Sequence, residues 1–299
     1  MTDTHVVIAG GSGLIGGALT QALRADGVRV TRLVRRPALI PDEVEWLTGD
    51  GPLNPTALEG TVAVVGLSGA SIGKLPWTHS YRETLRRSRL EPTRELARAL
   101  RQLGSDAPAF LSASATGFYG SQPGKRLTEG SRPGDTFLAD LCVQWERAAL
   151  EAGPGTRVVH LRTAPLLDRR GVLKPLLALT RFGISGPLGS GKQVWPWISL
   201  DDEVRAIRHL IDHEVSGPVN LTGPTSATAS EIGRSLAQSL QRPFVVPAPA
   251  WALRLGLGAD AADSLLLPDA NTVPDALIAS GFEFHHHTPA DAIAAALGA

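Results

Sequence analysis

Three glycines spaced three residues apart, Gly10, Gly13 and Gly16, separate an apolar run from an alanine- and leucine-rich stretch. Glycine has no Cβ, so a loop built from it can turn tightly and let phosphate groups approach the backbone. A helix that begins at such a loop also offers unpaired N–H groups and the positive end of its dipole. The pattern predicts a dinucleotide-binding loop at Gly10, Gly11, Ser12 and Gly13, with an ordinary strand–helix turn as the alternative.

The residue types at the end of the next apolar run indicate which dinucleotide would bind. An acidic residue about 20 positions beyond the glycines would accept hydrogen bonds from a ribose 2′-hydroxyl and favour NAD. This sequence has Arg35 and Arg36 there instead. A guanidinium pairs bidentately with a 2′-phosphate, which a carboxylate would repel. The two arginines predict NADP(H) rather than NAD(H); two solvated side chains at a strand end are the alternative.

Length and composition exclude several other kinds of protein. The 299 residues can form one large domain or a domain with a smaller lobe. The 29 Lys and Arg balance 29 Asp and Glu, which favours neither nucleic acid nor an anionic membrane as partner. No apolar run approaches the roughly 20 residues of a membrane span, and residues 5–9 are too short for a signal peptide. We therefore expect a cytoplasmic monomer or homodimer that acts on a small molecule.

Apolar runs alternate with helical patterns over the first 167 residues. Strands are expected at 5–9, 28–36, 61–69, 109–117 and 156–167, and helices at 14–25, 81–103 and 136–151. Strands and helices that alternate at this spacing form a parallel sheet with both faces covered. The predicted fold is therefore α/β, a Rossmann-type doubly wound parallel sheet.

The pattern changes after residue 168. A loop at 181–191 is followed by a helical pattern at 201–214, a short strand at 217–223 and an apolar helical segment at 250–267. We expect residues 1–167 to form an NADP(H)-binding Rossmann domain and residues 168–299 a smaller C-terminal α/β substrate lobe. Whether part of 201–223 belongs to the first domain is left open.

Several motifs follow the glycine loop in a fixed order. They are GLSGASI (66–72), SASATGFYG (112–120), FLADLCVQWE (137–146), LRTAPLL (161–167) and GPLGSGKQVWPWISLDD (186–202). Together with residues 246–284, they make the chain resemble the atypical extended short-chain dehydrogenase/reductases known as epimerase family proteins. The resemblance implies a Rossmann domain with NADP(H) and a C-terminal substrate lobe, and it implies no particular substrate.

The same resemblance implies cofactor contacts beyond the glycines and Arg35. One is Arg89, in the segment 77–93, whereas most other arginines near it are expected to form a solvated helix face. The remaining implied contacts are Leu14, Ile15, Leu67, Ser68 and Ser112.

The residues that would perform catalysis are incomplete. The resemblance implies a serine near the nicotinamide and a Tyr-x-x-x-Lys pair, whose lysine lowers the tyrosine pKa from about 10. Ser114 occupies the serine position, but Leu138 and Cys142 occupy the tyrosine and lysine positions. Cys142 is expected to be a small buried apolar residue. Tyr119 remains as a proton donor from the preceding loop.

These residues support three alternative functions. The first is an NADP(H)-dependent oxidoreductase in which Ser114 binds the substrate oxygen and Tyr119, water or the substrate supplies the proton. The second is a non-catalytic NADP(H)-binding sensor or partner-binding protein, which the missing pair favours. The third is a nucleotide-sugar epimerase, which needs a proton shuttle more than the others do.

Two further motifs partly match known binding sites, a nucleotide-binding P-loop and a histidine metal site, but each lacks residues that such a site needs. Residues 186–193 spell most of a phosphate-binding P-loop, but Gln193 has no hydroxyl for Mg²⁺ and no helix can follow through Pro196. His285, His286 and His287 are adjacent, so on a strand their side chains would alternate between faces. They are expected to be surface residues, and we expect no metal site.

Overall fold

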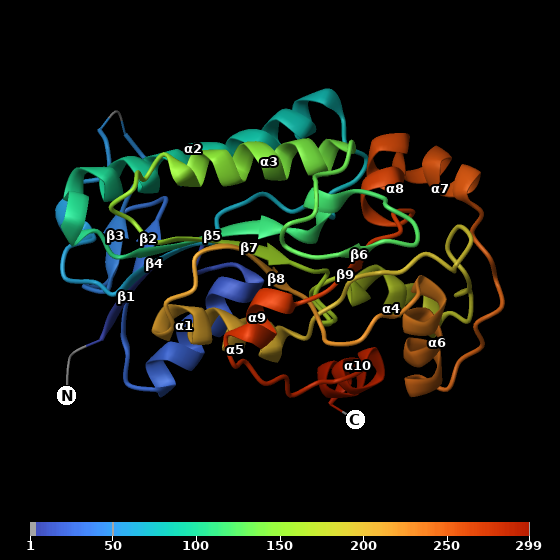
Figure 1. The fold of residues 1–299 in the computed structure, drawn as a ribbon. Coiled ribbons are helices and arrows are strands. Elements are labelled where there is room, and N and C mark those ends of the chain that lie inside the picture. The colour runs from blue at the N-terminus through green and yellow to red at the C-terminus, as the bar shows by residue number, and fades with distance from the viewer. Residues whose placement is uncertain (1–3, 50, 299) are drawn as a thin grey trace.

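The computed structural model describes residues 4–49 and 51–298, and in this part of the chain seven parallel strands form one sheet (Figure 1). The strand order is β3-β2-β1-β4-β5-β7-β8. The order reverses at β1, which confirms the predicted doubly wound Rossmann-type sheet. The strands are β1 (His5–Ala9), β2 (Arg29–Val34), β3 (Glu43–Glu45), β4 (Ala63–Gly66), β5 (Ala109–Ala115), β7 (Val158–Thr163) and β8 (Gly217–Leu221).

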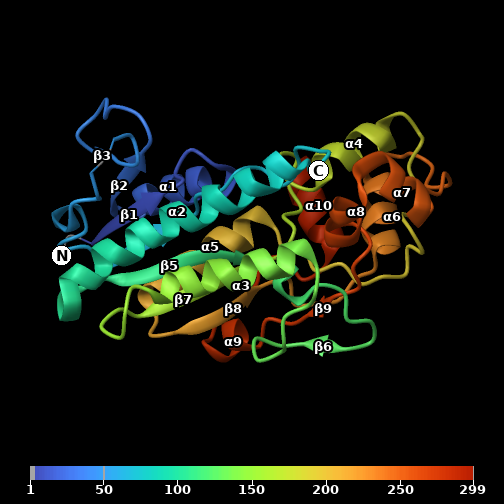
Figure 2. The same ribbon diagram turned by 90° about the horizontal axis from the view of Figure 1, so that it is seen from above.

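Two pairs of helices cover the two faces of this sheet. Helices α2 and α3 run side by side over one face, and α1 and α5 lie on the other (Figures 1 and 2). Among the described residues, no helix is both long and apolar enough to cross a membrane. The helices of these two layers are α1 (Leu14–Ala25), α2 (His79–Leu103), α3 (Phe137–Leu150) and α5 (Leu200–Asp212).

The alternation of strand side chains explains why the strands read as continuous apolar runs. In β1, Val6 and Ile8 belong to the core beneath α1 and α5, whereas Val7 and Ala9 belong to the core beneath α2. Successive residues of a strand point to opposite faces, and here helices cover both. Every position of β1 is therefore buried.

Part of the segment left open by the sequence lies in this sheet. Helix α5 packs beside α1, and β8 pairs with β7 as an edge strand. Residues 200–221 thus complete the layers that the first 167 residues begin. The division into domains at residue 167 stays a prediction.

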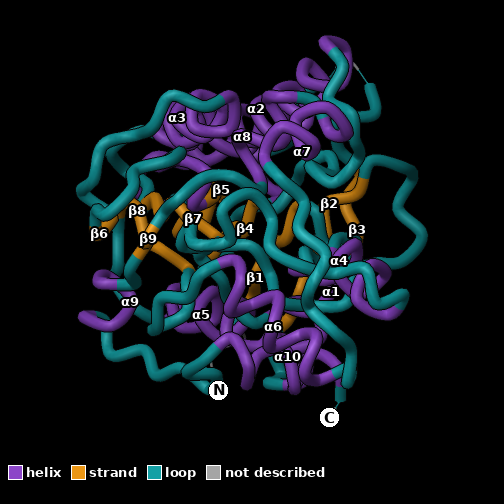
Figure 3. The backbone as a smooth tube through the Cα atoms, turned by 90° about the vertical axis from the view of Figure 1, so that its right-hand side faces the viewer, coloured by secondary structure: helices purple, strands orange, loops and turns teal. Residues whose placement is uncertain are grey.

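The remaining elements gather beyond the carboxyl ends of the strands, toward the viewer in Figure 3. The apolar segment expected at 250–267 forms two helices because Gly258, with φ of 87°, separates them. Two short strands, β6 (Arg126–Leu127) and β9 (Asn271–Thr272), pair in parallel outside the main sheet. The helices of this region are α4 (Leu173–Arg181), α6 (Ala229–Ser239), α7 (Ala250–Leu257), α8 (Ala259–Leu265) and α10 (Pro289–Leu297).

The chain returns from this region to the sheet before it ends. Helix α9 (Asp275–Ala279) packs against β8. Leu277, Phe282 and Phe284 are buried in the same apolar core as Val6 and Ile8 of β1. The C-terminal region therefore contributes side chains to the core beneath α1 and α5.

Candidate functional site

The loop between β1 and α1 brings the backbone of Gly10 against the chain that leaves β4. Gly10 has φ of +85°, and a Cβ there would lie 2.7 Å from the carbonyl carbon and oxygen of Leu67. A Cβ on Gly16 would lie 2.4 Å from the carbonyl oxygen of Gly10. In the described structure no side chain caps α1 at Gly13, which leaves its first N–H groups for a phosphate.

A cavity of about 670 Å³ lies where β1, β2 and β4 end. This volume is within the range of about 300–1,000 Å³ that small-molecule sites occupy. Glu43 and Trp46 also line it. Glu43 belongs to β3, which is too short to show a pattern in the sequence. The predicted contacts that line it are Gly10, Gly11, Ser12, Gly13, Arg35, Arg36, Leu67 and Ser68.

The other predicted contacts lie beside or behind this cavity. Leu14 and Ile15 are the first two residues of α1, directly after the glycine loop. Ser112 is fully buried in β5, and its hydroxyl has no hydrogen-bond partner among the described residues. Arg89 lies behind Gly69, a residue that lines the cavity. Ser112 is thus the predicted contact that the structure encloses most completely.

Glu43 on β3 engages two of the three arginines at the cavity edge. Its buried carboxylate accepts hydrogen bonds from both Nη atoms of Arg36 at 2.8 Å and from Nη2 of Arg32 at 2.7 Å. The Arg36 guanidinium, with the backbone N–H of Leu39, lowers the pKa of Glu43 to about 2. Arg35 is exposed and makes no ion pair or hydrogen bond with the described residues. Arg35 is therefore the arginine with donors available to a 2′-phosphate.

Ser114 lies in a buried polar network between β5 and α3. Its hydroxyl donates to Oε1 of Glu146 at 2.7 Å, and Ser114 is only 4% exposed. Glu146 also forms an ion pair with Arg162 of β7. The guanidinium carbon of Arg162 lies 3.6 Å from the centroid of the Phe118 ring. The hydroxyl proton of Ser114 is thus committed to Glu146, while its oxygen can still accept a hydrogen bond.

Tyr119 lies at the other end of the same network and is 0% exposed. Its hydroxyl donates to Oδ1 of Asn220 at 2.6 Å and accepts from Nη1 of Arg162 at 2.9 Å. Burial raises the pKa of Tyr119 above its ordinary value, although Arg162 opposes that effect. To protonate a substrate, Tyr119 would have to break these bonds and leave the interior. Its role as proton donor stays a prediction.

Leu138 and Cys142, which occupy the positions on α3 expected for the tyrosine and the lysine, are both buried. Leu138 packs in an apolar cluster with Trp77, Tyr81 and Ala261 of α8. Burial raises the pKa of Cys142 to about 12, so its thiol is neutral at physiological pH. Cys142 is the buried apolar residue that the sequence predicted.

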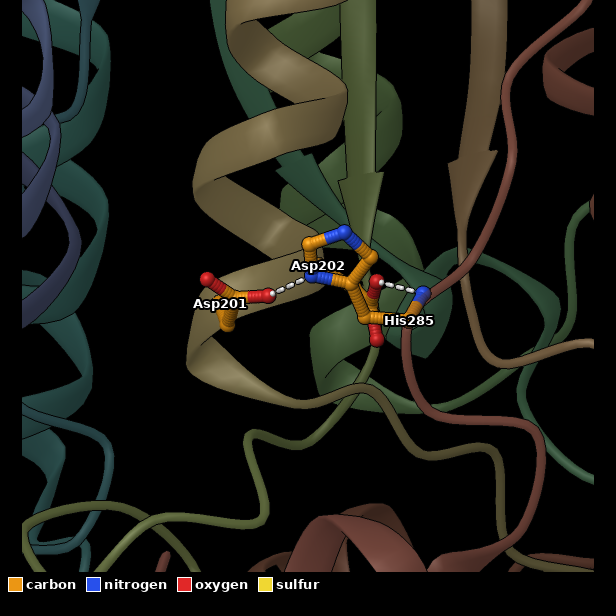
Figure 4. Close-up of side chains that lie close together, drawn as sticks. All are labelled: Asp201, Asp202 and His285. Atoms are coloured by element: carbon orange, nitrogen blue, oxygen red, sulfur yellow. Dashed lines mark hydrogen bonds and ion pairs between the residues drawn. The ribbon is translucent and has the colours of Figure 1, made fainter. Parts of the chain in front are cut away.

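Asp201, Asp202 and His285 come together at the start of α5 (Figure 4). Nδ1 of His285 lies 2.8 Å from Oδ2 of Asp201, and the backbone N–H of His285 donates to Asp202 at 2.7 Å. Asp202 also accepts hydrogen bonds from Ser199 and His286. Contrary to expectation, His286 is therefore half-buried rather than a surface residue. Asp202 thus joins the C-terminal segment, through His285 and His286, to the start of α5.

Comparison with known proteins gives matches along nearly the whole chain. Residues 6–222 match the NAD dependent epimerase/dehydratase family, and residues 248–296 match a domain of unknown function, DUF1731. An epimerase family protein of Mycobacterium leprae is 40% identical over 291 residues, which cover 96% of this chain and 94% of that protein. The human epimerase family protein SDR39U1 is 31% identical over 285 residues, with 94% and 95% covered.

Two solved structures extend the similarity to three dimensions. The crystal structure of human SDR39U1 with NADPH matches with a TM-score of 0.88 at 30% identity, covering 97% of this chain and 98% of that chain. A nucleoside-diphosphate sugar epimerase from Corynebacterium glutamicum matches with a TM-score of 0.79 at 32% identity, covering 99% of this chain and 58% of that chain. The chain therefore belongs to the NAD dependent epimerase/dehydratase family, as an epimerase family protein similar to SDR39U1 with a C-terminal DUF1731 segment.

Proposed function

We propose that this protein binds NADP(H) in the cavity at the glycine loop and acts as an oxidoreductase on a small molecule with a carbonyl or alcohol group. The observation that carries the cofactor assignment is Arg35, which lines the cavity with no partner of its own among the described residues. The human relative SDR39U1 was crystallised with NADPH, which supports the same assignment.

The residues around the cavity fit such a dinucleotide. A Cβ at Gly10 would collide with the backbone of Leu67, and one at Gly16 with the backbone of Gly10, so the tight turn that leads into the N-terminus of α1 requires glycine at both positions. The α1 N-terminus would bind the diphosphate, and Arg35 the 2′-phosphate. Because Arg32 and Arg36 both pair with Glu43, its negative charge does not repel that phosphate. When bound, the cofactor supplies or accepts hydride at its nicotinamide.

Ser114 remains the proposed contact for the substrate oxygen. Because its proton goes to Glu146, its oxygen is the group that can still accept a hydrogen bond. It is therefore better suited to a substrate hydroxyl than to a carbonyl, unless the bond to Glu146 breaks. An alcohol bound in this way is the product when NADPH donates hydride and the substrate when NADP⁺ accepts it.

The cofactor assignment is tested by measuring dissociation constants for NADPH and NADH by fluorescence titration. Removing the charge-assisted bonds of Arg35 should weaken NADPH binding in Arg35→Ala by about 10- to 100-fold and change NADH binding little. Arg29→Ala, at the opposite end of β2 and exposed, is the matched control. Equal affinity for both cofactors in the unmodified protein, with the ratio unchanged in Arg35→Ala, would overturn the assignment.

A second function is favoured by the buried positions of Ser114, Tyr119, Leu138 and Cys142, namely an NADP(H)-binding protein without turnover. Absorbance of NADPH is followed with a panel of carbonyl compounds, alcohols and nucleotide sugars. Turnover that Ser114→Ala abolishes supports the oxidoreductase, and turnover lost in a folded Tyr119→Phe supports the proton donor predicted there. Tight NADPH binding with no turnover on the panel supports the second function.

A further inference from the structure

Cys142 occupies the position on α3 that is expected to hold a lysine. A cation on the neighbouring helix, Arg89 of α2, approaches the same side of α3. Arg89 of α2 lies against the side of α3 that carries Trp145, three residues after Cys142. The guanidinium carbon of Arg89 lies 5.3 Å from the centroid of the ring of Trp145, one turn along α3 from Cys142. The positive charge that α3 lacks is thus present beside the same face of α3.

Backbone carbonyls hold this guanidinium in place. Nη2 of Arg89 donates to the carbonyl oxygen of Ala70 at 3.0 Å, and Nη1 donates to that of Leu85 at 3.1 Å. The N–H of Ala70 donates to Oγ of Ser88 at 2.9 Å. Two consecutive residues of α2 therefore hold both backbone groups of Ala70, and Arg89 is fixed to the loop that follows β4.

Arg89 has no counterion in the described part of the chain, unlike most arginines of the same helix. Carboxylates pair with Arg82, Arg86, Arg87, Arg94 and Arg98. Burial lowers the pKa of Arg89, with Cys142 and Tyr81 opposing that effect, yet an arginine keeps its proton at physiological pH. A half-buried cation held only by neutral carbonyls can still attract or repel charge on a ligand, because no carboxylate neutralises it.

This charge lies directly behind the wall of the cavity. A Cβ on Gly69 would lie 3.2 Å from Cζ of Arg89, and Gly69 lines the cavity. Arg35 follows β2, whereas Gly69 follows β4, and the sheet order places β1 and its glycine loop between them. A dinucleotide with its 2′-phosphate at Arg35 and its diphosphate at the loop therefore extends toward β4 and Arg89.

We propose that Arg89 supplies, from α2, the fixed positive charge at the nicotinamide end that a lysine on α3 would otherwise supply. The proposal rests on the proposed binding of NADP(H). A fixed cation repels the positively charged nicotinamide of NADP⁺ and leaves the neutral ring of NADPH unaffected. Arg89 therefore favours the reduced cofactor over the oxidised one and acts as a positioning residue for hydride donation.

The proposal is tested by measuring both dissociation constants by calorimetry and dividing the constant for NADP⁺ by the constant for NADPH. Arg89→Met should lower the ratio by about tenfold through tighter NADP⁺ binding, and Arg89→Lys should keep it. Arg87→Met removes an exposed arginine of the same helix that pairs with Glu91, and it should leave both constants unchanged. Arg89→Gln replaces Arg89→Met if the latter does not fold.

Further arms separate the possible failures. Equal weakening of NADP⁺ and NADPH in Arg89→Met would show that Arg89 only holds the loop at Ala70, and it would overturn this proposal alone. Absence of binding of either dinucleotide by the unmodified protein would overturn the proposed function as well.

Discussion

The carboxylate of Glu146 accepts hydrogen bonds from Nε and Nη2 of Arg162, at 2.8 and 2.9 Å, between α3 and β7. The side chains are 11% and 4% exposed. This ion pair connects the two residues for which the sequence predicted catalysis, because Ser114 donates to Glu146 and Arg162 donates to Tyr119. Ser114 and Tyr119 thus belong to one buried network that joins three strands to α3.

Breaking this pair should be costly. Arg162→Met leaves the carboxylate of Glu146 buried without its counterion, and we expect the free energy of unfolding to fall by about 3–5 kcal/mol. Arg94→Met, which breaks the exposed pair with Glu151, should cost no more than about 1 kcal/mol. Urea denaturation of both variants measures the difference. A similar small loss in both would show that the buried network does not stabilise the fold.

A methyl group should destabilise the protein at Gly10 of the glycine loop but not at Gly17 of α1. At Gly10 the positive φ and the contact with Leu67 should make Gly10→Ala lose about 1–3 kcal/mol and most NADPH affinity. At Gly17, inside α1, a Cβ would have no atom nearer than 3.7 Å, so Gly17→Ala should gain up to about 1 kcal/mol. Thermal unfolding and NADPH titration check both. Unchanged stability and affinity in Gly10→Ala would contradict the geometry of the loop.

Glu43 should make the stability of the protein depend on pH at the acid end. Arg36 lowers its pKa from 4.5 to about 2 in the folded chain. The stabilisation is therefore complete above about pH 4.5 and is lost as the pH falls through about 2. Glu43→Gln should flatten the stability curve in that window, as measured by urea denaturation at a series of pH values. Asp42→Asn, on the exposed neighbouring residue, is the control.

Glu203 should make the stability of the protein depend on pH in the opposite direction to Glu43. Burial raises its pKa to about 8, partly opposed by Oγ1 of Thr163, which donates to Oε1 at 2.7 Å. Oε2 is buried and has no partner among the described residues. A raised pKa means that stability falls as the pH rises from about 4.5 to about 8. Glu203→Gln should remove this fall and stabilise the protein at pH 8 by an amount on the order of 4 kcal/mol.

The measurement for Glu203 is the free energy of unfolding at about pH 5 and about pH 8. Glu59→Gln, which removes an exposed carboxylate elsewhere in the chain, should leave the difference between the two values unchanged. If Glu203→Gln and the unmodified protein lose stability equally between the two values, Glu203 is already ionised in the folded chain.

Local patterns were sufficient to predict most of the sheet and its four covering helices. The sequence predicts β1 at residues 5–9 and α1 at 14–25, and the structure has both with those bounds. Strand β3 was missed because three residues carry no measurable alternation of apolar and polar types. The pairing of Glu43 with Arg36 was missed with it, since that pairing depends on where β3 joins the sheet.

The candidate site was predicted less completely, because its contacts join residues far apart in the chain. Tyr119 lies in a glycine-flanked loop, where an exposed hydroxyl is a natural expectation. Its partners Arg162 and Asn220 come from β7 and β8, 43 and 101 residues further along the chain. Likewise, the approach of Arg89 to Trp145 depends on how α2 packs on α3, which neither helix specifies alone.

The return of the chain to the sheet limits how its parts can be exchanged between relatives. The family match treats residues 248–296 as a separate segment, yet Leu277, Phe282 and Phe284 are buried beneath α1 and α5. A graft of this segment from another protein would have to carry side chains that fit the recipient's sheet. Exchange of this C-terminal segment is therefore expected to succeed only when the matching surface of α5 and β8 is transferred with it.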